Sequence, residues 1–220
     1  MPKPSISSTP ALFPDSLLLP KLSPPRQSAT LVERTRLLAQ LDQAWTYRLT
    51  LLSASAGFGK TTLLSAWVAN CPHPVAWLSL EEQDNDPMRF WSYVVAALRT
   101  NEPGVGETAL SMLQAPQPPA LTTILTALIN DLAAGQEEVV LVLDDYHVLD
   151  DPAIISSVQF LLEHLPSRLH LVLAGRSDPL LALPRLRARG QVVEVRDRDL
   201  RFTRAEAALF LTQAMGLSLG

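Results

Sequence analysis

The 220-residue sequence predicts an α/β fold in three layers, with a parallel five-stranded sheet between two layers of helices. Five short apolar segments alternate along the chain with segments whose apolar residues recur at helical spacing. The apolar segments are continuous, which is typical of parallel strands covered on both faces. Apolar residues make up 47% of the chain, and its length is sufficient to bury one substantial core.

The predicted elements follow one another in the order that a parallel sheet requires. Strands are expected over residues 47–54, 74–80, 138–145, 168–176 and 191–195. Helices are expected over residues 31–45, 60–70, 86–98, 120–134 and 155–165, followed by a short helix within 180–190 that is interrupted at Pro184.

Local signals indicate several element boundaries. Asp86 is a suitable N-cap for the third predicted helix, and Gly135 is expected to end the fourth. Thr203 and Glu206 have the spacing of a capping box, which predicts the start of a further helix. Four prolines lie within residues 101–119, so this segment is expected to form an irregular surface loop.

The composition divides the chain into three parts. Residues 1–27 contain seven prolines and many serines, which predicts a flexible, disordered leader. Residues 28–202 hold all five predicted strands and form the expected domain. Residues 203–220 are expected to be the first helix of a following module, truncated here as though cut from something longer.

Bulk properties exclude several classes of protein. The formal net charge of −4 gives no overall attraction to nucleic acid. Cys71 is the only cysteine, so no internal disulfide can form, and a small apolar filling role in a reducing compartment is expected for it. No apolar run approaches the roughly 18–20 residues that span a bilayer, and Pro14 and Asp15 interrupt the apolar N-terminal stretch. A cytoplasmic protein without membrane partners is therefore expected.

The segment "SASAGFGKTT", residues 53–62, lies between the first predicted strand and a helix, where a phosphate-binding loop belongs. Backbone N–H groups and the positive end of the helix dipole can bind phosphate there, with Lys60 on the outer phosphates and the Thr61 hydroxyl on Mg²⁺. Ala54 replaces the usual first glycine; Gly57 and Gly59 are the positions expected to need unusual dihedrals. The alternative is a tight turn that contains GKT by chance. The predicted nucleotide-binding residues of the loop are Ala56, Gly57, Phe58, Gly59, Lys60, Thr61 and Thr62.

Two further strand ends carry charged side chains. The third predicted strand ends in Asp144, a candidate ligand of the Mg²⁺ shell, and Asp145, a candidate for orienting or deprotonating water. The fourth ends before Arg176, which is expected to face the terminal phosphate if this strand lies between the other two. The alternatives are a solvated acidic strand end and a surface arginine. Three such elements in this order predict a P-loop NTPase that binds ATP or GTP.

The chain resembles the nucleotide-binding domain of the MalT-like, large ATP-binding LuxR-type bacterial transcription regulators, a branch of the STAND class of signal-transduction ATPases. The resemblance covers about residues 28–215. It rests on "LVERTRLL" (31–38), "SAGFGKTTLLSAW" (55–67), "VAWLSLEEQDNDPMRFWSYVVAAL" (75–98), "LVLDDYHVLDD" (141–151), "LVLAGRSDPLLALPRLRARG" (171–190) and "RDLRFTRAEA" (198–207).

The resemblance implies an AAA/STAND-like domain that binds ATP with Mg²⁺ and uses it as a switch. It implies Walker A roles for Lys60 and Thr61, Walker B roles for Asp144 and Asp145, and a γ-phosphate sensor at Arg176. It also places Arg34 and Arg36 near the nucleotide base. Self-association with ATP, and slow hydrolysis as a reset, are implied as well.

The chain departs from the family at two places. Ala54 and Ser55 differ from the usual loop, where proline often precedes the AGxGKT run, and this difference alters the stiffness expected of the loop. The sensor arm and helix-turn-helix of family members are not in this sequence, so direct DNA binding is not expected of it. Two other functions remain open: an ATPase that couples hydrolysis to work, and a scaffold that binds no nucleotide.

Overall fold

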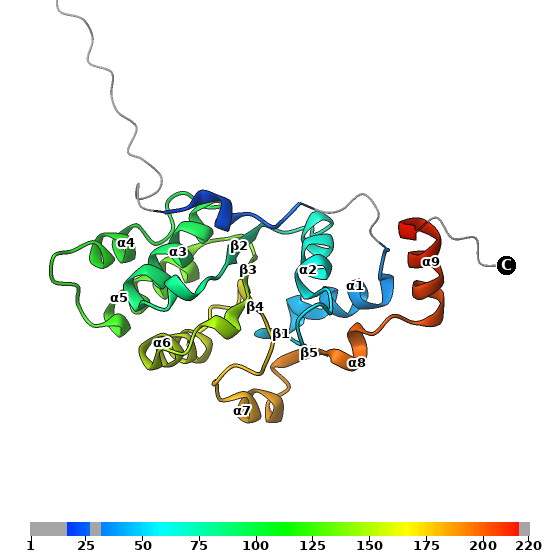
Figure 1. The fold of residues 1–220 in the computed structure, drawn as a ribbon. Coiled ribbons are helices and arrows are strands. Elements are labelled where there is room, and N and C mark those ends of the chain that lie inside the picture. The colour runs from blue at the N-terminus through cyan, green and yellow to red at the C-terminus, as the bar shows by residue number, and fades with distance from the viewer. Residues whose placement is uncertain (1–16, 27–31, 216–220) are drawn as a thin grey trace, which may run out of the picture.

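The computed structural model describes residues 17–26 and 32–215 (Figure 1). Its centre is one sheet in the order β2-β3-β4-β1-β5, with every neighbouring pair parallel. The predicted five-stranded parallel sheet is therefore confirmed, and β4 lies between β1 and β3 as expected. The strands are β1 (Leu49–Ser53), β2 (Val75–Ser79), β3 (Val139–Asp144), β4 (Leu169–Gly175) and β5 (Val192–Arg196).

Helices form both outer layers. The α-helices are α1 (Thr35–Leu41), α2 (Lys60–Ala69), α3 (Pro87–Arg99), α4 (Glu107–Leu113), α5 (Leu121–Ala134), α6 (Pro152–Glu163), α7 (Leu183–Ala188), α8 (Asp197–Leu200) and α9 (Arg204–Met215). Four short 3-10 helices complete the described elements: η1 (Leu19–Leu22), η2 (Asp42–Thr46), η3 (Glu82–Asp84) and η4 (Tyr146–Val148).

The sheet separates two hydrophobic cores, because successive side chains of a strand point to opposite faces. In β3, Leu141 and Leu143 belong to the core beneath α3, α5, α6 and α7, whereas Val140 and Val142 belong to the core beneath α1 and α2. Every residue of β1, β3 and β4 is buried, which explains why their sequences are continuously apolar.

The predicted caps are present. The Asp86 carboxylate accepts a hydrogen bond from the backbone N–H of Arg89 at 2.8 Å. Thr203 and Glu206 form the reciprocal pair of a capping box at the start of α9. Figure 1 shows α9 (red) at the end of the molecule on the side of α1 and α2, far from α4 and α5.

Three sequence predictions, one about a loop and two about helices, were wrong. Residues 101–119 contain α4, whose Ala109 and Leu113 are buried in the larger core, so a segment rich in proline at its end still holds a packed helix. Pro184 does not interrupt α7: it lies in the first turn, where a missing N–H is tolerated. Helix α6 also begins at Pro152, earlier than predicted, because the Asp151 carboxylate caps its N-terminus.

The prediction of a disordered leader was wrong for residues 17–26, while residues 1–16 lie outside the described part. Leu22 packs in the larger core, and the Lys21 ammonium is buried in an ion pair with Asp84. Composition alone could not reveal this, because the partner acid lies 63 residues further along the chain.

Among the described residues, no helix has both the length and the apolar character needed to cross a membrane.

Candidate nucleotide-binding site

The glycine-rich turn connects β1 to α2. Gly57 has a φ of 82° and Gly59 a φ of 78°, and a Cβ on either would meet nothing within 4 Å. Glycine is therefore needed for its backbone dihedrals and not for space, as the sequence predicted. Ala54 is 2% exposed, packs in the smaller core and does not have a positive φ, which explains why alanine is tolerated there.

Lys60 begins α2, and its side chain turns back beneath the loop. Its Nζ donates hydrogen bonds to the backbone carbonyls of Ala54 at 2.6 Å and Ser55 at 3.1 Å. Burial lowers the pKa of Lys60, while the nearby carboxylates of Asp145 and Asp144 oppose this effect. The loop is thus closed around an ammonium group, with residues 55–57 and 59 exposed above it.

Thr61 and Asp144 form the next layer of the site. The Thr61 hydroxyl donates a hydrogen bond to Asp144 Oδ2 at 2.7 Å, although the two residues are 83 positions apart. Asp144 is 2% exposed, and this burial raises the pKa of its carboxyl group. A hydroxyl and a carboxylate in contact are oxygen ligands of the kind that Mg²⁺ prefers.

Asp145 has an unusual backbone conformation. It is the only non-glycine residue with a positive φ, 58°, in the described ranges 17–26 and 32–215. Its N–H donates to Asp144 Oδ1 at 3.0 Å, and its own side chain is 47% exposed. This geometry directs one carboxylate into the structure and leaves its neighbour facing solvent, where a water molecule can reach it.

His147 adjoins the acidic pair. Its Nδ1 lies 3.7 Å from Asp145 Oδ1. Burial lowers the pKa of His147, opposed by the charge of Asp145 and reinforced by the charges of Arg176 and Lys60. The His147 side chain also lies against Gly175, the last residue of β4.

Arg176 follows β4 and is exposed at the same rim of the sheet. Its charge lowers the pKa of Lys60, which places the guanidinium within electrostatic reach of the loop. Arg176 lines an open groove of about 570 Å³ together with Ser53, Ala54, Arg196 and Asp197. The strand order thus brings Lys60, the acidic pair and Arg176 together.

Arg34 and Arg36 both contact the segment that leads from β5 into α9, and their place near the nucleotide base stays a prediction. Arg34 donates to the carbonyl of Arg201 at 2.9 Å and lies over the ring of Phe202, while Arg36 donates to the carbonyl of Asp199 at 2.8 Å. Within the described part of the chain, neither side chain hydrogen-bonds the phosphate loop. Both guanidinium groups instead hold the segment that leads from β5 into α9.

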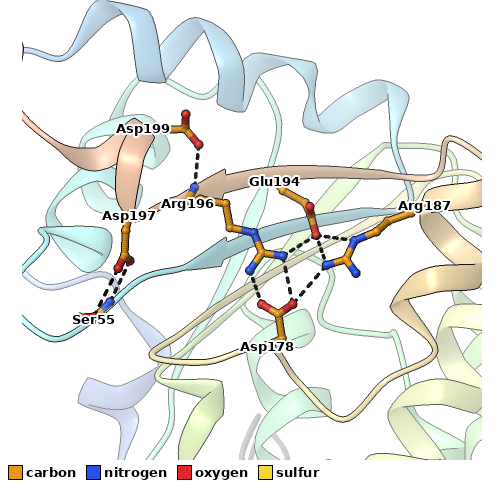
Figure 2. A network of polar contacts seen from close by, with 7 residues as sticks. All are labelled: Ser55, Asp178, Arg187, Glu194, Arg196, Asp197 and Asp199. Carbon is orange, nitrogen blue, oxygen red and sulfur yellow. Dashed lines mark hydrogen bonds and ion pairs between the residues drawn. The ribbon is translucent and has the colours of Figure 1, made fainter.

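A network that the sequence analysis did not assign lies beside the loop (Figure 2). The Asp197 carboxylate accepts from the N–H of Ser55 at 3.1 Å and from its hydroxyl at 3.4 Å. Nearby, Arg196 pairs with Asp178 and with Glu194, and the hydrogen bond from Arg196 lowers the pKa of Asp178 to about 2. The alternation of arginine and acid over residues 185–201 was the available signal, because it predicts mutual charge compensation.

The residues at this rim fit a nucleoside triphosphate with Mg²⁺. The loop presents exposed backbone above a buried ammonium, and the start of α2 adds its dipole. Thr61 and Asp144 already touch and would hold the metal ion. Such a loop, acidic strand end and strand order define the class of P-loop NTPase domains.

Comparison with known proteins shows which family the chain belongs to. A sequence model of the family described as the AAA ATPase domain matches residues 30–174, and the chain belongs to this family. The chain is 40% identical over 195 residues to the HTH-type transcriptional regulator MalT of Cronobacter sakazakii, and 39% identical over 195 residues to that of Klebsiella pneumoniae. Each alignment covers 88% of this chain and 22% of the relative, so the chain spans about a fifth of the length of these regulators. The resemblance to MalT-like regulators is confirmed.

Among solved structures, Cdc6p from Pyrobaculum aerophilum has a similar fold. The TM-score is 0.51 with 18% identity, over 81% of this chain and 49% of that one. At this identity the similarity shows the fold alone. It confirms the three-layer P-loop arrangement that the sequence predicted.

Proposed function

We propose that this chain binds ATP with Mg²⁺ and acts as the nucleotide-dependent switch of a MalT-like transcription regulator. One observation carries the proposal: the strand order brings Lys60, the Thr61–Asp144 pair, Asp145 and Arg176 to a single rim. Three separate sequence segments supply these groups, which a turn containing GKT by chance would not explain.

Each group has a role that follows from its position. The exposed backbone of the loop and Lys60 hold the β- and γ-phosphates, and Arg176 contacts the terminal phosphate from the end of β4. Thr61 and Asp144 hold Mg²⁺, which neutralises phosphate charge when bound. The solvent-facing Asp145 carboxylate orients a water molecule and accepts its proton.

The geometry supports slow hydrolysis. The aspartate side chain at position 145 is shorter than the glutamate of many ATPases, so it reaches a water molecule less well. Turnover below about 1 s⁻¹, lost in Asp145→Asn, would indicate a switch, whereas faster turnover would indicate an ATPase that couples hydrolysis to work. In the proposed cytoplasmic regulator, ATP binding by this domain promotes self-association, and DNA binding resides outside this sequence.

Calorimetry with Mg-ATP on Lys60→Ala tests the proposal. Losing the charge-assisted contacts should weaken binding by roughly 10- to 100-fold. Arg189→Ala is a matched control, because it removes one exposed positive charge from the residue that follows α7 and leaves the loop intact. Its affinity should stay within about twofold of wild type, as expected for a screened surface charge. Equal affinities of the Lys60→Ala variant and wild type, with both folded, would refute nucleotide binding at this loop.

A further inference from the structure

The contact between Ser55 and Asp197 joins the phosphate loop to α8 (Figure 2). Both oxygens of the Asp197 carboxylate are used: Oδ1 accepts from the backbone N–H and Oδ2 from the hydroxyl of the same residue. Ser55 is the first exposed residue after β1. The carboxylate therefore holds the loop at the point where it leaves the sheet.

Asp197 lies in a segment that is itself held in place by β5 and α8. It follows directly on β5, whose Arg196 is the register partner of Ser53 in β1. Helix α8 is anchored by the buried side chain of Leu200 and by Asp199, whose Oδ2 accepts from the N–H of Arg196 at 2.9 Å. The carboxylate thus belongs to a structured segment of the chain.

The loop has a physical need for such a contact. Residues 55–57 are exposed, and Gly57 and Gly59 give the free loop many alternative conformations. Ordering each backbone residue costs about 1–2 kcal/mol, so a loop that is held beforehand binds phosphate more tightly. A proline at position 55 would stiffen the chain but would have no N–H to donate. Serine makes the contact with Asp197 possible.

We propose that Asp197 is a positioning residue, which holds the Ser55 end of the phosphate loop in its binding conformation. The inference rests on the proposed function. The negative charge of Asp197 has an opposing effect on binding. The Asp197 carboxylate is close enough to Lys60 for its charge to oppose the lowering of the Lys60 pKa by burial, and it repels an incoming triphosphate. A carboxylate at this place lowers anion affinity through its charge and raises it through the hydrogen bonds.

Two variants separate these opposing effects. Asp197→Asn removes the charge and keeps an oxygen that accepts from the Ser55 N–H, whereas Asp197→Ala removes both. Because the two variants carry the same charge, their difference in Mg-ATP affinity reports the hydrogen bond alone. By calorimetry, Asp197→Asn should bind at least as tightly as wild type, and Asp197→Ala about fivefold more weakly than Asp197→Asn.

Hydrogen exchange of the nucleotide-free protein supplies a second, independent measurement. The Ser55 amide should be protected in wild type and in Asp197→Asn, and should exchange several-fold faster in Asp197→Ala. Arg198→Ala is the control for disturbance of α8, because its side chain is 86% exposed and its ion pair is with Asp199. This control should match wild type in the exchange of the Ser55 amide.

The outcomes distinguish the two proposals. Equal affinities of the alanine and asparagine variants in a protein that binds Mg-ATP would overturn the positioning role, and so would unchanged exchange at Ser55. Absence of Mg-ATP binding by the wild type would instead overturn the proposed function, and exchange at Ser55 would still decide whether Asp197 orders the loop.

Discussion

The buried ion pair of the N-terminal segment makes a sharp prediction about stability. Lys21 is 6% exposed and Asp84 is 0% exposed, and the two side chains are in direct contact. Lys21 Nζ also lies 3.6 Å from Glu81 Oε2 and 4.5 Å from the centroid of the Tyr93 ring. Replacing Lys21 with Met keeps most of its volume and removes its charge, so Asp84 remains buried without its lysine.

The expected magnitude follows from the partners that remain. Removing one partner of a buried ion pair typically costs 3–5 kcal/mol. Asp84 keeps two donors, Arg89 Nε at 3.1 Å and the Glu81 N–H at 2.9 Å, so the lower end applies and Lys21→Met should lose about 3 kcal/mol. For a chain of this length, this loss corresponds to a fall of roughly 6–12 °C in Tm.

Urea unfolding followed by tryptophan fluorescence measures this loss, because Trp67, Trp77 and Trp91 are buried. Arg26→Met is the matched control, since Arg26 is an exposed cation of the same segment and its loss should change the free energy of unfolding by less than about 0.5 kcal/mol. Adding Asp84→Asn to Lys21→Met should recover part of the loss, because it removes the uncompensated charge. If Lys21→Met unfolds at the same urea concentration as Arg26→Met, residues 17–26 do not contribute to the cooperative fold.

Two further predictions concern Gly135 and Asp178. A Cβ on Gly135 would lie 1.5 Å from Arg168 Nη1, which donates to the carbonyl of Leu132 at 2.9 Å, so Gly135→Ala should destabilise the domain by roughly 1–3 kcal/mol in thermal unfolding. An unchanged Tm in Gly135→Ala would contradict this packing. The folded-state pKa of Asp178, about 2, lies below its ordinary value of 3.8, so its stabilising effect is present above pH 4 and is lost as the pH falls towards 2. The difference in unfolding free energy between wild type and Asp178→Asn should therefore shrink between pH 5 and pH 2.5, and a constant difference would contradict the ion pair with Arg196.

Much of the candidate site was accessible from sequence because its parts lie in one tight turn and at strand ends that the topology of a parallel sheet brings together. The glycine dihedrals at positions 57 and 59 follow from a tight turn between a strand and a helix. The approach of Asp144 to Thr61 follows from topology, since parallel strands bring their carboxyl ends to one edge of the sheet. The position of Arg176 at that edge follows in the same way once β4 lies between β1 and β3.

The sequence by itself determined the alternation of strands and helices, the continuously buried strands and the helix caps at Asp86 and Thr203, because these depend on periodicity and on residues within one turn. Only the tertiary structure decided which distant charges meet. The pair Lys21–Asp84, the hydrogen bonds of Asp197 with Ser55 and the binding of Arg34 to the segment before α9 join residues 63 to 167 positions apart. The sequence contains many possible partners for each of these side chains, and the packing of the folded chain decides which of them it contacts.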